Sequence, residues 1–105
     1  MAQFIITYLG GNPQDTPEEG NVHFAKYQQW LGALGDSVLS SANPLKNTHS
    51  LSPDGTVALG GNSTMSGHTI IEVDSMDSAL EAAKTCPFLE IGGSLEVSEL
   101  IKMSV

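Results

Sequence analysis

The chain has 105 residues, of which 40% are apolar, and its twelve acidic residues and four lysines give it a formal net charge of -8. This length predicts a single domain over residues 1–105, and the acidity argues against nucleic acid as a partner because the charges would repel phosphates. No apolar run approaches about 20 residues, so neither a membrane-spanning segment nor a membrane partner is expected.

The N-terminal segment is expected to form the first strand. Residues 3–9 (QFIITYL) are rich in β-branched and aromatic types, and both faces are apolar, which predicts a central strand covered on both sides. No basic stretch precedes it, so no signal peptide is expected. The single Cys86 cannot form an intrachain disulfide and fits a reducing compartment. A cytoplasmic protein is therefore predicted.

A helix is predicted from Thr16 to Leu34. Thr16 and Glu19 form a capping box, Pro17 suits the first turn, and Gly35 suits the position after the last turn. The expected buried stripe comprises Phe24, Tyr27, Leu31 and Leu34, with Trp30 beside it. Residues 37–45 (SVLSSANPL) follow as a second strand, and Pro44 predicts either that pairing weakens there or that the strand lies at an edge of the sheet.

The long polar segment over residues 46–66 is expected to carry a hairpin. Ser52-Pro53-Asp54-Gly55 is a turn signal, and residues 56–59 can pair with residues near Ser50. A loop of this length in a small domain is often functional.

A β-α-β unit closes the chain. A strand at 69–73 leads to Ser75 as an N-cap and to a helix with Met76, Ala79, Leu80 and Ala83 at helical spacing. Pro87 is expected to end the helix, Gly92-Gly93 to turn, and residues 94–103 to form the last strand. The whole order predicts an α+β, ferredoxin-like βαββαβ antiparallel sheet with two helices on one face. Its other face would remain uncovered, which favours a homodimer.

The stretch TIIEVDSMDSALEAAKTCPFLEIGGSLEV, the Asn43-Pro44-Leu45 corner and the Ser52-Pro53-Asp54-Gly55 turn together resemble the YCII-related family, also called DGPF-domain proteins. The resemblance implies a domain that dimerises through its open sheet face into a dimeric α/β barrel. Members are small, mostly bacterial proteins of unknown function. Relatives include dehydrochlorinases with a site built on a His and an Asp, and the wider group includes muconolactone isomerases and cofactor-free monooxygenases. No cofactor is therefore expected.

The resemblance makes His23 the first candidate catalytic residue. In the branch with a His/Asp site, a His stands early in the first helix, where this chain has His23. The acidic partner in that branch precedes the Pro after the second helix, a position that Cys86 occupies here. Asp36, just past the first helix, is the candidate substitute. The alternative is a helical His without a catalytic role.

His68 and Glu72 are the second candidate pair. Period-two alternation places both on one face of the third strand, opposite the β-branched residues that suit packing on helices. A His and a carboxylate on the dimer side can support proton transfer, or they can be polar residues of the interface. His49 is expected to be exposed, and Cys86 to be a buried thiol. No ligand pair has metal-site spacing, so no metal is expected.

Three functions stay open at this point. The first is a cofactor-free lyase- or isomerase-type enzyme with His23 or His68 as proton carrier, acting on a small molecule in a pocket between the sheet and the partner subunit. The second is a non-catalytic small-molecule-binding or regulatory dimer, and the third is a structural subunit without a ligand. An enzyme requires a His nitrogen within hydrogen-bond reach of a carboxylate in a cleft.

Overall fold

The computed structural model describes residues 2–10, 16–61 and 65–101. Two α-helices, two 3-10 helices (labelled η) and six strands follow one another along the chain in the order β1 (Ala2–Gly10), α1 (Pro17–Leu34), η1 (Gly35–Ser37), β2 (Val38–Pro44), β3 (His49–Leu51), β4 (Val57–Leu59), β5 (Met65–Val73), α2 (Met76–Lys84), η2 (Pro87–Ile91) and β6 (Gly93–Glu99).

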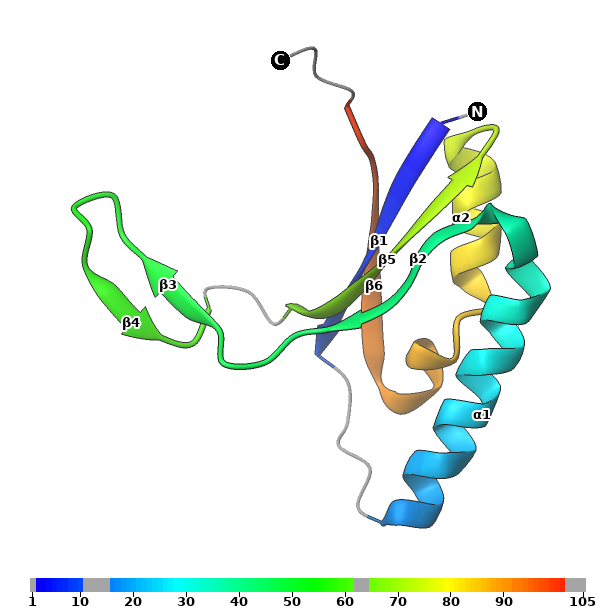
Figure 1. The fold of residues 1–105 in the computed structure, drawn as a ribbon, viewed down its shortest axis with the longest axis horizontal. Helices are drawn as coiled ribbons and strands as arrows, with labels where there is room; N and C mark the ends of the chain where they lie inside the picture. The colour runs from blue at the N-terminus through cyan, green and yellow to red at the C-terminus, as the bar shows by residue number, and fades with distance from the viewer. Residues whose placement is uncertain (1, 11–15, 62–64, 102–105) are drawn as a thin grey trace.

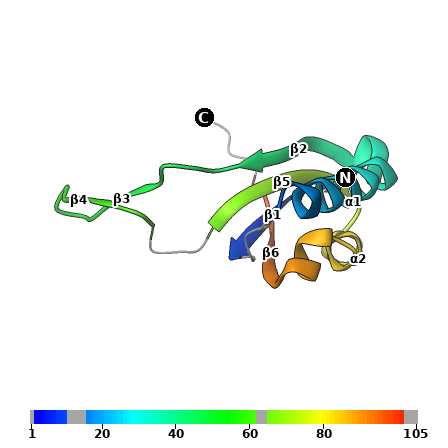
Figure 2. The ribbon, with the colours of Figure 1, turned by 90° about the horizontal axis from the view of Figure 1, so that it is seen from below.

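Four strands form the main sheet in the order β2-β5-β1-β6, and every neighbouring pair is antiparallel. Both α-helices lie on the same side of this sheet (Figures 1 and 2). This arrangement confirms the predicted α+β, ferredoxin-like fold. It also confirms that β1 is central and that β2, which ends at Pro44, lies at the edge.

The helix boundaries follow from local hydrogen bonds. The Thr16 side chain accepts a hydrogen bond from the backbone N–H of Glu19, and Ser75 accepts one from Ser78, so both predicted N-caps are confirmed. The second helix ends earlier than expected, at Lys84, because Pro87 opens a separate 3-10 turn rather than terminating α2 directly. This turn places Phe88 and Ile91 beside α1.

The core lies between the sheet and the helices. The indole N–H of Trp30 donates to the carbonyl of Ala82 at 2.9 Å and ties α1 to α2. The buried apolar side chains come from β1, α1, β5, α2 and the turn after α2: Phe4, Ile6, Tyr8, Tyr27, Trp30, Ile71, Ala79, Ala83 and Cys86. The structure therefore confirms Cys86 as buried.

Two details of the predicted core are wrong. Phe24 was expected in the buried stripe of the first helix, but it is 61% exposed. The first strand was expected to be covered on both faces. Only the face with Phe4, Ile6 and Tyr8 is buried, because both helices pack on that side. The opposite face of the sheet is left without a covering layer in the single chain.

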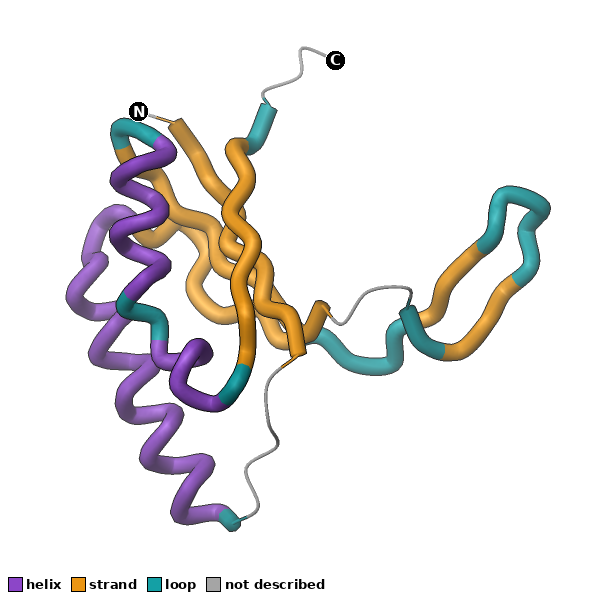
Figure 3. The backbone as a smooth tube through the Cα atoms, turned by 180° about the vertical axis from the view of Figure 1, so that it is seen from behind, coloured by secondary structure: helices purple, strands orange, loops and turns teal. Residues whose placement is uncertain are grey.

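The predicted hairpin is confirmed as β3 and β4. The Ser52–Gly55 turn joins the strands, with the N–H of Gly55 donating to the carbonyl of Ser52 at 2.8 Å. The hairpin projects from the body of the domain as an arm (Figures 1 and 3). The last strand, expected over 94–103, is described only as β6, and residues 102–103 lie outside the described part of the chain. None of the described helices is long and apolar enough to cross a membrane.

Candidate functional site

Three hydroxyl groups from three elements meet beneath α1. Thr69 of β5 is fully buried, and its Oγ1 shares one hydrogen bond with the Tyr8 hydroxyl and another, at 3.3 Å, with the Tyr27 hydroxyl. Tyr8 belongs to β1 and Tyr27 to α1, so the cluster joins the middle of the sheet to the helix that covers it. We call these three residues the hydroxyl cluster.

The environment keeps the Tyr27 phenol protonated. Burial raises its pKa most, the hydrogen bond from Thr69 lowers it in part, and the nearby Cys86 thiol raises it further. A neutral phenol can donate a hydrogen bond but is a poor base. The hydroxyl cluster can therefore orient an oxygen atom of a ligand, whereas another group has to accept a proton.

An aromatic cavity of about 250 Å³ lies over the cluster. The Tyr8 ring meets that of Tyr27 edge-on at 5.9 Å and that of Phe88 at 5.2 Å. The cavity is lined by residues from both central strands, α1, the end of β2 and η2: Tyr8, His23, Phe24, Tyr27, Asn43, Pro44, Ser66 and Phe88. We call this space the aromatic cavity.

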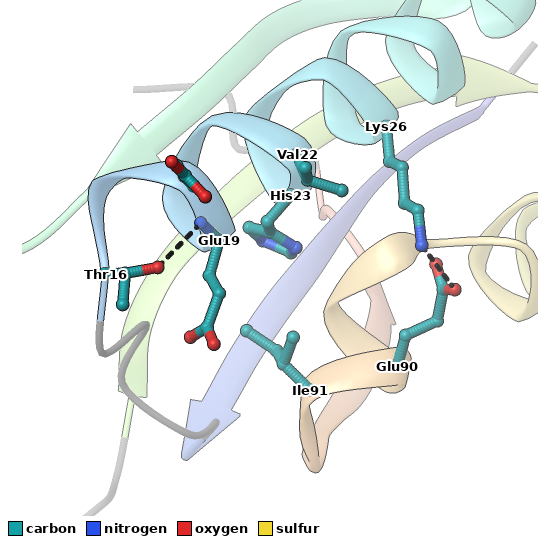
Figure 4. Close-up of a pocket in the computed structure, with 8 residues that line it drawn as sticks. Thr16, Glu19, Val22, His23, Lys26, Glu90 and Ile91 are labelled. Carbon is teal, nitrogen blue, oxygen red and sulfur yellow. Dashed lines mark hydrogen bonds and ion pairs between the residues drawn. The ribbon is translucent and has the colours of Figure 1, made fainter.

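His23 also faces a second, more polar cavity of about 620 Å³ between α1 and η2 (Figure 4). One wall of that cavity is the ion pair between Lys26 and Glu90, whose charged atoms are 3.3 Å apart. His23 is half-buried, and its ring centroid lies 6.1 Å from that of Tyr27. The imidazole thus stands at the junction of an apolar and a charged space, which suits a group that exchanges protons with a ligand.

Glu19 is the carboxylate that sequence reasoning missed. It precedes His23 by one helical turn, and residues four apart are neighbours on a helix surface. Both side chains line the larger cavity (Figure 4). Within the described part of the chain, no hydrogen bond joins His23 to a carboxylate. The spacing of four residues inside the predicted helix was the signal that could have identified Glu19.

Asp36 cannot take the role suggested for it within one chain. It lies in η1, just beyond the C-terminal end of α1, whereas His23 lies near the N-terminal end. Thirteen residues at the helical rise correspond to roughly 20 Å. The sequence-based idea that Asp36 orients His23 is therefore wrong for a single subunit.

His68 and Glu72 do not form a pair. They share the open face of β5, but four residues of extended chain separate them by about 13 Å. Glu72 instead accepts a hydrogen bond from Gln3 at 3.4 Å. Because the neighbouring Gly67 and Thr69 are buried on the helix side, His68 points to the opposite side of the sheet from His23. The two histidines therefore lie on opposite sides of the sheet and do not line one cleft within a subunit.

The strand register places an acidic residue, Glu96, in the same row as His68 but two strands away. Thr7 of β1 pairs with His68 on one side and with Glu96 of β6 on the other, which aligns the three residues across the open face. The His68 Nδ1 is buried and has no hydrogen-bond partner among the residues that the structure describes. The register of the sheet is a property of the folded chain, so sequence periodicity alone did not reveal this row.

The remaining candidates have simpler surroundings. His49 is exposed on the arm, as expected, and its Nδ1 lies 2.9 Å from the carbonyl oxygen of Asn47. Burial raises the pKa of the Cys86 thiol to about 11, so it is protonated at neutral pH. Over residues 2–10, 16–61 and 65–101, no three His, Cys, Asp or Glu side chains are gathered closely enough to hold a metal ion.

Comparison with known proteins identifies the fold. No protein-family model and no curated protein matches this sequence. Among solved structures, the chain is similar to 5-chloro-2-hydroxyhydroquinone dehydrochlorinase (TftG) from Burkholderia phenoliruptrix AC1100, in complex with 2,5-dihydroxybenzoquinone. The two share 17% identity with a TM-score of 0.57, over 91% of this chain and 90% of that one. The fold is shared. Both chains therefore have the α+β architecture described above.

Proposed function

We propose that this protein is a cytoplasmic, YCII-related homodimer that acts as a cofactor-free lyase- or isomerase-type enzyme on a small molecule. His23 is the residue that moves the proton. One observation carries the proposal: the His23 imidazole lines the same cavity as Tyr8 and Tyr27, whose hydroxyls are hydrogen-bonded to the buried Thr69. Such a concave apolar space with a few convergent polar groups is typical of a ligand site.

The cavity suits a single-ring ligand that carries oxygen. Its volume of about 250 Å³ is small, and its walls include the rings of Tyr8, Phe24 and Phe88. Aromatic side chains favour stacked or edge-on contacts with another ring. The neutral Tyr27 phenol can donate a hydrogen bond to a ligand oxygen. TftG, of the same fold, acts on such a ring, and we propose the same substrate class here.

In this proposal, His23 accepts a proton from the bound molecule as general base. In a lyase-type step, the electrons of the broken bond to hydrogen form a new double bond, and the leaving group departs with its own bonding pair. In an isomerase-type step, the imidazolium returns the proton at another atom. Glu19 can orient and charge-balance the imidazolium from the preceding turn. The expected placement of the pocket against the open sheet face is replaced by one beneath α1.

The alternative is a non-catalytic module that binds a small molecule in the same cavity. One observation favours it: among the described residues, His23 has no hydrogen-bonded carboxylate to hold one tautomer. A binding module requires only the aromatic walls and the hydroxyl cluster. The two functions share the ligand class and differ in whether loss of the imidazole abolishes a reaction.

The uncovered face of the sheet is a separate observation that supports the proposed homodimer. The sheet face opposite the helices carries Ile5 and Ile70 and has no covering layer in one chain. On the same face, the buried His68 Nδ1 lacks a partner among the described residues. A second copy seated on this face would bury the isoleucines and can supply the missing hydrogen bond.

Chloride release from 5-chloro-2-hydroxyhydroquinone, together with binding of 2,5-dihydroxybenzoquinone, tests the function. If the protein is an enzyme, it should release chloride faster than the buffer alone does. The rate of chloride release should fall about 100-fold or more in His23→Gln and should not change in the matched control His49→Gln. Binding of the quinone without chloride release would favour the binding module. Neither binding nor release, in a folded protein, would contradict the proposed ligand class.

A further inference from the structure

The β3–β4 arm has one apolar face and one face of small side chains. The strand register pairs His49 with Leu59, Ser50 with Ala58 and Leu51 with Val57. Directly paired residues share a face, and successive residues alternate. One face of the arm therefore presents Leu51, Val57 and Leu59, together with His49. We call this the apolar face of the arm.

The apolar face of the arm is largely solvent-exposed in the single chain. Leu51 is 70% exposed, Val57 59% and Leu59 83%. An isolated two-stranded hairpin is only marginally stable in water, and its stability usually requires packing of an apolar face. Strands β3 and β4 contact mainly each other. The arm extends past the sheet, away from both helices (Figures 1 and 3). Its cover must come from beyond the subunit's own body.

We propose that a second copy of this chain covers the apolar face of the arm, so that each subunit of the dimer clasps the other. This inference rests on the homodimer of the proposed function and goes beyond it. The arm is continuous with β2 and β5, which contribute to the open sheet face. A copy seated on that face would lie beside the root of the arm, and the arm would pass along its surface.

The area of the open face supports a clasp. Four strands of seven to nine residues present a planar area of about 500 Å², from spacings of about 4.8 Å between strands and 3.3 Å per residue. A stable interface buries about 800 Å² per partner. The exposed apolar side chains of the arm would add to the surface that the sheet face contributes.

Charge also favours another copy as the occupant. Lys46 and Asp54 are the only formal charges between residues 45 and 61, so the arm is neutral although the chain carries -8. Two acidic bodies repel each other. A neutral ribbon can approach an acidic subunit without adding to this repulsion, and the copy offers it exposed apolar side chains such as Leu39 of β2.

Sedimentation velocity over a concentration series tests the clasp. The test variant Leu51→Ser/Leu59→Ser removes apolar surface from one face of the arm, and the matched control Ser50→Ala/Ala58→Ser changes the opposite face of the same strands. The clasp predicts a dimer dissociation constant raised at least tenfold in the test variant and changed less than twofold in the control. Circular dichroism checks that both variants are folded.

A third variant separates failure of the clasp from failure of the dimer. Ile70→Lys places a charge on the open sheet face and leaves the arm intact. If the wild-type chain dimerises, and Ile70→Lys weakens the dimer whereas Leu51→Ser/Leu59→Ser does not, the clasp is overturned and the sheet-face dimer stands. A wild-type chain that is monomeric at micromolar concentration would overturn both. Equal weakening by the test and control variants would also overturn the assignment to the apolar face.

Discussion

The hydroxyl groups of Tyr8 and Thr69, 61 positions apart in the sequence, share a hydrogen bond in the middle of the sheet. Tyr8 comes from β1 and Thr69 from β5, and the two strands are neighbours. Tyr8 is also one of the residues that line the aromatic cavity. Because Tyr27 contacts the same threonine, this floor also connects the sheet to α1, so stability and the candidate site depend on the same residues.

Replacement of Thr69 by Val should therefore destabilise the protein. Thr69→Val keeps the shape but removes the oxygen that both tyrosines contact, and buried groups left unsatisfied typically cost about 1–3 kcal/mol. Urea unfolding measures the loss. The double variant Tyr8→Phe/Thr69→Val should lose less free energy of unfolding than the sum of the losses in the two single variants. Each single variant already removes the hydrogen bond that the two residues share. Strict additivity would show that the hydroxyl groups do not interact.

Gly67 and Gly32 form a matched pair of glycines, one closely surrounded and one open to solvent. A Cβ at Gly67 would lie 2.9 Å from the carbonyl oxygen of Asn43 and 3.3 Å from the Tyr8 ring, so Gly67→Ala should destabilise by about 1–3 kcal/mol. Gly32 lies exposed in α1 with nothing within 4 Å of its Cβ position. Gly32→Ala should stabilise by about 0.5–1 kcal/mol. Thermal unfolding of both variants shows whether each substitution raises or lowers the stability. Equal changes in stability would contradict the close approach of Asn43 and Tyr8 to Gly67.

The Cys86 thiol should make the protein less stable at alkaline pH. Burial raises its pKa from 9.0 to about 11, so the folded state holds the proton to higher pH than the unfolded state does. The stabilisation is complete below pH 9 and is lost as the pH rises toward 11, by about 3 kcal/mol in total. Urea unfolding between pH 8 and pH 10 measures how steeply the free energy of unfolding falls with pH.

Cys86→Ala is the control for this pH dependence. It removes the thiol and should flatten the stability profile between pH 8 and pH 10, apart from changes due to other groups. A native thiol of this kind should also react slowly with a thiol reagent at neutral pH and rapidly in denaturant. Rapid labelling of the folded protein, or an unchanged slope in Cys86→Ala, would show that the thiol is accessible.

Much of the fold could be predicted because its signals are local. Thr16 and Ser75 cap helices through bonds to residues three positions away, and the Ser52–Gly55 turn closes a hairpin whose strands are adjacent in sequence. The site depends on relations that are not local. The alignment of His68 with Thr7 and Glu96 requires the strand register, and the hydroxyl cluster requires three elements to meet.

The errors have the same origin. Helical periodicity predicted that Phe24 is buried, but periodicity does not report where α1 extends past the sheet and leaves a residue exposed. Asp36 follows α1 closely in sequence, yet the length of the helix carries it far from His23. Glu19 and His23, in contrast, are neighbours for a local reason, and their spacing could have been recognised before the structure.

The central claim is that His23 serves a ligand in the aromatic cavity, and an NMR titration of the three imidazoles with resorcinol tests it most directly. Resorcinol is a single ring with two hydroxyls, which matches the rings and hydroxyl groups that line the cavity. We predict saturable changes in the His23 imidazole and the Tyr8 and Tyr27 ring signals, with the exposed His49 unchanged. Changes confined to His68, or no saturable change at millimolar resorcinol, would contradict the account.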